Sequence, residues 1–224
     1  MPSEPPLSLS AEEGPGSAVL VEGDSDRAAL EAVAVRRGRD LAVEGVRIVP
    51  VGGATNVRRV LASAPLRGVR VSVLCDQAEE GIVRRAWERA GRSSAGASVF
   101  VCVADLEQEL IRAAGPAAVL EVVAAQGEDR SFAALRQQPA HRGRPVEDVL
   151  RRFMGSRSGR KATYARLLVE ALPLSAVPAP LDAALASVLP ASGGRRADGT
   201  AIAAWRGDLT DLPPTRTGGS VGRS

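Results

Sequence analysis

The sequence predicts an α/β protein with a parallel sheet of about four strands flanked by helices, followed by a C-terminal helical appendage. Two observations carry this prediction. In the first half of the chain, short runs of branched apolar residues alternate four times with helical segments, a pattern typical of parallel strands joined by right-handed crossovers. After Pro116 only the helical pattern continues. A chain of 224 residues is long enough for one sizeable α/β core with such an appendage.

The first strand-helix unit sets the pattern for the others. Residues 18–21 are small, branched and uncharged, which suits a strand buried on both faces. Gly23 breaks the run, and we expect Asp24 or Ser25 to cap a helix over 26–37. The remaining units follow in the same order, with strands at 46–51, 69–74 and 98–103 and helices at 55–64, 79–90 and 106–113.

Glycines mark the turn after the second predicted strand. Gly52 and Gly53 favour a tight turn there, and close approach to a phosphate is an alternative role for them. Thr55 is the predicted cap of the helix that follows.

The second half of the chain is predicted to be helical. Gly and Pro residues separate five helical segments, at 119–125, 131–137, 146–154, 160–172 and 181–189. The termini are polar, rich in Gly, Ser or Pro, and without periodicity, so we expect them to be disordered. The predicted organisation is a leader, an α/β domain, a helical appendage and a tail, at 1–16, 17–114, 115–190 and 191–224.

Carboxylates follow three of the four predicted strands. They are Glu22 with Asp26, Asp76 with Glu79 and Glu80, and Asp105 with Glu107. The carboxyl ends of parallel strands meet at one edge of a sheet, where open α/β sheets bind their ligands. Converging carboxylates repel one another unless a cation lies among them. Because hard oxygen donors are the ligands of Mg²⁺ and Mn²⁺, the pattern predicts a site for one of these ions.

Several of these carboxylates also have a purely structural alternative. Glu22 would be a solvated strand end, and Glu79 and Glu80 would be acids that favour a helix start. Asp105 with Gln108 matches a capping box.

Composition excludes several classes of function. Aromatic residues make up 3% of the chain, too few for base-stacking platforms. Cys75, Cys102 and His141 are the only Cys and His residues; they exclude a four-ligand zinc site, and the two thiols indicate a reducing compartment. The chain has no P-loop and no dinucleotide-binding glycine motif. No apolar run approaches the roughly 18 residues of a membrane span, so we expect a cytoplasmic protein with no membrane partner.

Positive charge is concentrated in one segment. The whole chain carries a formal net charge of +3, whereas residues 136–161 contain eight basic and two acidic residues, a net charge of +6. Such a concentration favours contact with the phosphates of a nucleic acid, the alternative being a solvated helix face. The candidate nucleic-acid contacts are Arg151, Arg152, Arg157, Arg160 and Lys161, the only lysine of the chain.

Four motifs together resemble a known family. VLVEGDSD, VPVGGATN, VSVLCD and VADLEQEL are similar to the Toprim domain of topoisomerases, primases and especially OLD-family nucleases. The resemblance covers residues 17–114, and GSRSGRKATYARLLVEAL is similar to the lysine-bearing helical segment that follows the Toprim core in OLD proteins. It implies a Toprim/Rossmann-like fold. Because the chain has no P-loop, the resemblance also implies a stand-alone relative without the ATPase domain. A separate ATPase and a second copy of the chain, in a homodimer, are the candidate protein partners.

The resemblance implies roles for individual residues. Glu22 matches a glutamate that binds metal or acts as general acid or base, and Asp26 matches the acidic residue four positions later. Asp76 matches the first aspartate of the DxD motif. The acidic pair Asp105 and Glu107 matches an element that contributes to the second metal. The remaining match is Lys161, at the lysine that neutralises charge on the phosphate in the transition state.

The sequence departs from the family at Ala78, where the second carboxylate of the DxD motif is missing. Glu79 or Glu80 is available to replace it, and we take Glu80 as the candidate ligand. The leading hypothesis is a DNA endonuclease that uses two Mg²⁺ or Mn²⁺ ions, with Glu22, Asp76 and Lys161 as its catalytic residues.

Two other functions stay open. Ala78 favours a catalytically weak Toprim module that binds metal and nucleic acid, or docks on a separate ATPase, without cutting. A domain that binds a small phosphorylated ligand is the third possibility, and it leaves the basic segment unexplained.

Overall fold

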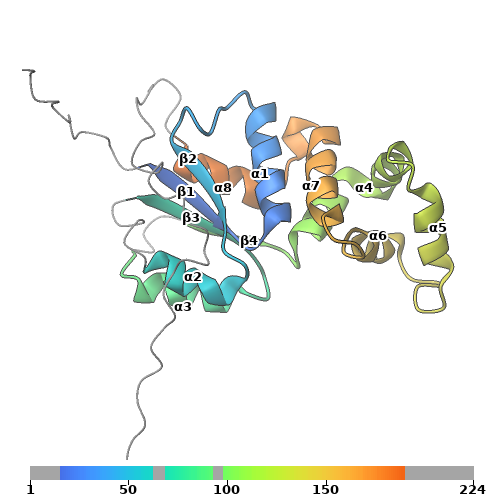
Figure 1. Cartoon of the computed structure of the whole chain (residues 1–224), viewed down its shortest axis with the longest axis horizontal. Coiled ribbons are helices and arrows are strands. Elements are labelled where there is room, and N and C mark those ends of the chain that lie inside the picture. The colour runs from blue at the N-terminus through green and yellow to red at the C-terminus, as the bar shows by residue number, and fades with distance from the viewer. Residues whose placement is uncertain (1–15, 63–68, 93–97, 190–224) are drawn as a thin grey trace, which may run out of the picture.

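A four-stranded parallel sheet forms the centre of the computed structural model, which describes residues 16–62, 69–92 and 98–189. The strand order is β2-β1-β3-β4, and every neighbouring pair is parallel. The strands are β1 (Ser17–Val21), β2 (Val46–Pro50), β3 (Arg70–Asp76) and β4 (Val99–Cys102) (Figure 1). The predicted α/β class and strand number are thereby confirmed. The predicted leader and tail lie outside the described residues, apart from residue 16.

Strand β1 is apolar throughout because both of its faces are covered. Val19 and Val21 pack into one hydrophobic cluster together with helices α1, α4, α7 and α8, whereas Ala18 and Leu20 pack into a second cluster together with α2 and α3. The helices that follow the strands are α1 (Asp24–Arg36), α2 (Ala54–Leu61), α3 (Glu80–Arg89) and α4 (Leu106–Ala125).

Helix α1 begins in a way that the sequence did not predict. Gly23 is its N-cap residue, so Asp24 and Ser25 are already helical and neither caps it. Instead, the backbone N–H of Gly23 donates to Oδ2 of Asp26 at 2.9 Å. Asp26 is thereby held in the first turn with its carboxylate directed back towards the end of β1.

Helix α2 also begins one residue earlier than predicted. Its N-cap residue is Gly53, and Thr55 is inside the helix rather than at the cap. Gly52 and Gly53 have φ angles of +71° and +106°, values that favour glycine. The backbone N–H of Gly52 donates to the carbonyl oxygen of Glu22 at 3.0 Å, which holds this turn against the end of β1.

The remaining helices divide into two groups. Helix α4 continues to Ala125 through a non-helical Gly115 (φ 75°, ψ 149°), which joins two segments predicted to be separate helices. It leads to α5 (Asp129–Gln137) and α6 (Val146–Met154), which extend away from the sheet (Figure 1). The last elements, α7 (Arg160–Ala171), a 3-10 turn (Leu174–Ala176) and α8 (Ala179–Val188), return to the α/β core.

Hydrogen bonds hold α7 and α8 against the α/β core. One guanidinium nitrogen of Arg36, at the end of α1, donates to the carbonyl oxygens of Val169 and Leu172 at the end of α7. The Ser72 hydroxyl in β3 donates to the carbonyl oxygen of Ala184 in α8 at 3.3 Å. Helices α7 and α8 therefore form part of the cover of one sheet face, and the predicted domain boundary at residue 115 stays a prediction.

Two further expectations concern the cysteines and the membrane. Cys75 and Cys102 are buried and not in a disulfide, and burial raises the pKa of the Cys75 thiol to about 12, so this thiol stays protonated. None of the described helices is both long enough and apolar enough to cross a membrane.

Candidate functional site

A cavity of about 490 Å³ opens at the carboxyl edge of the sheet, beside the point where the strand order reverses between β1 and β3. We call it the carboxylate cavity. Its walls come from the turns after β1 and β2, the end of β3 and the first turns of α4 and α7. The lining residues are Glu22, Gly23, Asp24, Ser25, Asp26, Gly52, Gly53, Asp76, Leu106, Glu107, Gly159, Lys161 and Ala162. Four predicted carboxylates and the predicted lysine thus lie around one cavity.

Burial and mutual repulsion raise the pKa values of three carboxylates of this cavity. Burial raises the pKa of Asp26 to about 6, and the charges of Glu107 and Glu22 add to this effect. Burial also raises the pKa of Asp76 to about 7, reinforced by the charges of Asp26 and Glu22. The pKa of Glu22 is raised in the same direction, first by burial and then by the charge of Glu79. The cluster therefore retains protons near neutral pH unless a cation compensates its charge.

Lys161 is the one basic residue among those that line this cavity. Its Nζ donates to Oε2 of Glu107 at 3.1 Å, and Glu107 is 4% exposed. Burial alone would lower the pKa of Lys161, but the charge and hydrogen bond of Glu107, together with the charges of Asp105 and Asp76, outweigh burial, and the pKa is raised. Gly159, with a φ of 75°, is the N-cap residue of α7 and places Lys161 in the first turn of the helix. The other carboxylate oxygen of Glu107, Oε1, is buried and has no hydrogen-bond partner.

The structure distinguishes the two glutamates that follow Ala78. Glu79 is the N-cap residue of α3. After burial, its charge and a side-chain hydrogen bond are the largest causes of the raised pKa of Glu22, and its Oε2 is buried without a partner. Glu80 is the first residue of α3 and forms an ion pair with Arg84 at 2.7 Å. The structure therefore brings Glu79 rather than Glu80 beside Glu22.

Asp105 lies near the cavity but has two structural partners. Its Oδ1 accepts from the backbone N–H of Gln108 at 2.9 Å, so Asp105 caps α4 as its capping-box pattern indicated. Its Oδ2 forms an ion pair with Arg151 of α6. Both oxygens are engaged in these contacts, and Asp105 is not among the residues that line the carboxylate cavity.

The predicted nucleic-acid contacts differ in exposure. Arg160 is 8% exposed; it donates to Glu128 at 2.7 Å and its guanidinium lies 4.1 Å from the centroid of the Phe153 ring. Arg152 and Arg157 are exposed, and Arg151 is held by Asp105. The structure presents Arg152, Arg157 and Lys161 towards solvent, whereas Arg160 is part of the packing between helices.

The carboxylate cavity fits a hard divalent cation. Within the described ranges, no three His, Cys, Asp or Glu side chains already form a metal cluster. The cavity nevertheless supplies carboxylate oxygens, the donors that Mg²⁺ and Mn²⁺ take. The buried, unpartnered Oε1 of Glu107 and the raised pKa values of Asp26 and Asp76 are features that a bound divalent cation would relieve.

This sheet order, with acidic residues at the ends of β1 and β3, is compatible with a Toprim-like fold. Residues 16–77 match the family model described as "Overcoming lysogenization defect protein-like, TOPRIM domain". The Toprim domain that this chain resembles is therefore that of OLD proteins, as its motifs predicted.

Solved structures agree with this assignment of the fold. The C-terminal region of the Burkholderia pseudomallei OLD protein superposes with a TM-score of 0.56 and 19% identity, covering 77% of this chain and 96% of that one. The corresponding region of the Xanthomonas campestris pv. campestris OLD protein gives a TM-score of 0.57 and 22% identity, covering 78% and 92%. A comparison with curated proteins found no match. The structural likeness extends beyond the sheet, because it covers more than three quarters of this chain.

Proposed function

We propose that this protein is a nuclease that uses Mg²⁺ or Mn²⁺ to hydrolyse phosphodiester bonds in DNA. The observation that supports this proposal is the gathering of four of the predicted carboxylates and the only lysine of the chain around one cavity at the carboxyl edge of a Toprim-like sheet. The resemblance to OLD nucleases supports nucleic acid as the substrate, and on the same basis we propose a separate ATPase as a partner.

Five carboxylates are the proposed metal ligands. Glu22, Asp26, Asp76 and Glu107 line the cavity, and Glu79 adds a carboxylate beside Glu22 in place of the one missing at Ala78. A divalent cation held there would activate a water molecule and neutralise charge on the phosphate. Asp105 takes a supporting role in this proposal, because its contacts hold α4 and α6 together.

Glu22 and Lys161 are the proposed catalytic residues. Burial and the charge of Glu79 raise the pKa of Glu22 above the ordinary carboxyl value, which suits a group that takes up and releases a proton during the reaction. Lys161 has a half-exposed side chain at the edge of the cavity, so its charge is available to a phosphate and would offset negative charge that develops in the transition state. The open turn formed by Gly52 and Gly53 leaves room for the sugar-phosphate backbone to approach.

Nicking of supercoiled plasmid DNA with Mg²⁺ or Mn²⁺ tests this proposal. We expect Glu22→Gln and Lys161→Ala to lower the nicking rate by about 100-fold or more, the usual effect of removing an acid-base group or an electrostatic stabiliser. Glu31→Gln and Arg166→Ala are matched controls, because Glu31 lies on α1, the helix that follows Glu22, and Arg166 shares α7 with Lys161; both are exposed and lie outside the cavity. We expect both controls to nick at the wild-type rate.

Ala78 supports a second candidate, a Toprim module that binds metal and nucleic acid without cutting. Wild-type protein that binds DNA but does not nick it with either metal would favour this candidate and contradict the nuclease proposal.

A further inference from the structure

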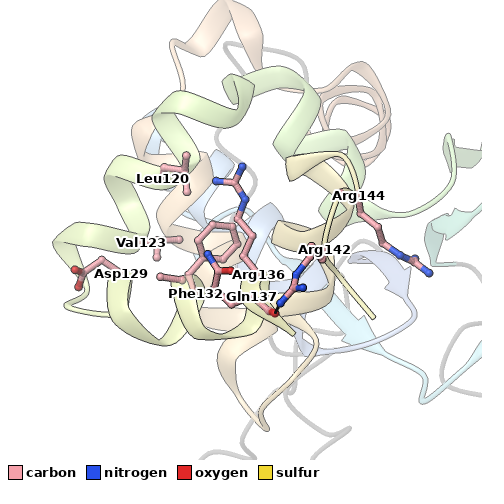
Figure 2. A pocket seen from close by; sticks show the side chains of 10 residues that line it. Leu120, Val123, Asp129, Phe132, Arg136, Gln137, Arg142 and Arg144 are labelled. Atoms are coloured by element: carbon pink, nitrogen blue, oxygen red, sulfur yellow. Dashed lines mark hydrogen bonds between the residues drawn. The ribbon is translucent and has the colours of Figure 1, made fainter. Parts of the chain in front are cut away.

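A second cavity, of about 690 Å³, lies between the C-terminal half of α4, helix α5 and the segment that leads to α6 (Figure 2). It shares no residue with the carboxylate cavity. Its lining residues are Leu120, Val123, Asp129, Phe132, Ala133, Arg136, Gln137, Arg142, Gly143 and Arg144. We call it the arginine cavity, after Arg136, Arg142 and Arg144.

The charge of this cavity is mostly uncompensated. Asp129 is its only acidic lining residue, and residues 130–146 contain no Asp or Glu. Among the ion pairs of the described residues, none involves Arg136, Arg142 or Arg144. Three exposed guanidinium groups without carboxylate partners create a positive potential that attracts anions.

The basic segment 136–161 therefore separates into two parts. Arg151 and Arg160 neutralise acidic residues of neighbouring helices and contribute to packing. The arginines that line the arginine cavity form no ion pair with an acidic residue of the described chain. Part of the segment's positive charge is therefore exposed at this cavity.

The segment that carries two of these arginines has a defined backbone conformation. The N–H of His141 donates to the carbonyl oxygen of Gln138 at 2.9 Å, and the N–H of Arg144 donates to that of His141 at 3.2 Å. Gly143, with a φ of 77°, lies between Arg142 and Arg144. Figure 2 shows the three guanidinium groups spread out rather than gathered at one point. A row of separated phosphates matches this spacing better than one small anion does.

The position of the cavity also favours a long ligand. Helix α5 lies at the far end of the long axis of the molecule, with α6 between it and α7 (Figure 1). Lys161, in the first turn of α7, belongs to the carboxylate cavity. A ligand that occupies both cavities at once must therefore extend along α6, as a nucleic-acid strand would.

We propose that the arginine cavity binds the phosphate backbone of DNA at a distance from the bond that is cut. The identity of the ligand rests on the proposed function, whereas the surface itself rests on the three arginines that have no carboxylate partner. Its contacts are to phosphates, so they hold and orient the DNA without selecting a base sequence.

DNA binding in EDTA tests this surface separately from cleavage. The measurement is the anisotropy of a labelled 30-base-pair duplex between 50 and 200 mM salt, with the full-length protein. We expect Arg136→Ala/Arg142→Ala/Arg144→Ala to weaken binding and to reduce the slope of log K against log salt by about 0.9 for each phosphate that is no longer neutralised. The matched control, Arg58→Ala/Arg85→Ala/Arg89→Ala, removes the same charge from exposed positions on α2 and α3. We expect it to keep the wild-type slope.

The variant Arg136→Lys/Arg142→Lys/Arg144→Lys separates the effect of charge from an effect on folding. It preserves the cations, so we expect it to retain most of the wild-type affinity and slope. Unchanged binding by the triple alanine variant would overturn the proposed surface and leave plasmid nicking, and with it the proposed function, unaffected. Weaker binding by that variant, together with a wild-type protein that never nicks, would support the surface and overturn the nuclease.

Discussion

Glu79 and Glu80 are neighbours in the chain yet have different surroundings. Because α3 begins at Glu80, the two side chains leave the backbone in different directions. In addition to burial, the charge and side-chain hydrogen bond of Glu79 raise the pKa of Glu22, whereas Glu80 forms an ion pair with Arg84 on the same helix. This pair therefore provides an internal comparison of the same chemical change at two adjacent positions.

We predict that Glu79→Gln weakens Mn²⁺ binding by about tenfold or more, the scale seen when groups around a metal site are altered. The reason is the removal of one carboxylate from the group beside Glu22. Titration calorimetry of the purified protein measures this without any substrate. Glu80→Gln is the control, and we expect it to bind Mn²⁺ within about twofold of wild type, since it removes only an exposed i,i+4 pair. Equal effects of the two variants would exclude a special role for Glu79.

At the level of elements, one polar cluster connects three helical segments. Arg160 of α7 donates to Glu128, at the N-cap of α5, and to the carbonyl oxygen of Phe153 in α6. The Tyr164 hydroxyl donates to the second oxygen of Glu128 at 2.8 Å. The rings of Phe153 and Tyr164 meet edge to face at 6.1 Å, so the polar groups are packed within an apolar wall.

We predict that Arg160→Ala lowers the free energy of unfolding by about 2 kcal/mol, because it leaves the Glu128 carboxylate without its main partner. Arg157→Ala is the comparison, since Arg157 is exposed and lies 3.8 Å from the same carboxylate; its effect should stay below about 0.5 kcal/mol. Urea denaturation followed by circular dichroism measures both. A stability decrease confined to Arg157→Ala would contradict the cluster as described.

Elements were more predictable from the sequence than their ends and their charged side chains. Strand β1 and helix α6 agree with the predicted ranges to within a residue. Their apolar residues are the ones that are buried, so the spacing of apolar residues in the sequence indicates where each element lies. The predicted start of α1 was wrong. The carboxylate of Asp26 accepts a hydrogen bond from the backbone N–H of Gly23, and residue preferences for the cap position do not include such a contact. The burial of Arg160 was missed because a charged residue in a basic run looks the same whether its partner is solvent or Glu128.

The residues around the carboxylate cavity were predictable for a topological reason. Parallel strands must end at one edge, so the acidic residues after β1 and β3 were expected there from their positions alone. Which of Glu79 and Glu80 faces Glu22 depends on where α3 begins, and helix ends are defined less sharply by sequence than helix centres.

For the molecule as a whole, the carboxylate cavity makes stability depend on pH. The pKa of Asp26 is raised from 3.8 to about 6, and that of Asp76 from 3.8 to about 7. The folded protein therefore binds more protons than the unfolded chain between these values. The resulting stabilisation is complete below pH 3.8 and is lost as the pH rises through about 6 to 7.

We predict that Asp76→Asn raises the melting temperature of the metal-free protein at pH 8 by roughly 2–4 °C, the change that ~1 kcal/mol produces in a domain of this size. The partial exposure of Asp76 keeps the gain at this modest level. The difference from wild type should disappear at pH 4, where the wild-type carboxyl group is already largely protonated. Mn²⁺ should stabilise wild type more than Asp76→Asn at pH 8. Thermal scans in EDTA and in Mn²⁺ measure both effects, and a variant less stable than wild type at pH 8 in EDTA would contradict them.

The return of α7 and α8 to the sheet has a consequence for how the protein is made. Helix α8 contacts β3 through Ser72, and α7 packs along α1. Both helices come from the C-terminal half of the described chain, so one face of the sheet stays only partly covered until residues 160–188 have left the ribosome. Contacts this distant in sequence form late and slow the folding reaction. We therefore expect the nascent α/β half to wait for its last two helices, and a fragment ending at residue 114 to expose an apolar face that favours aggregation.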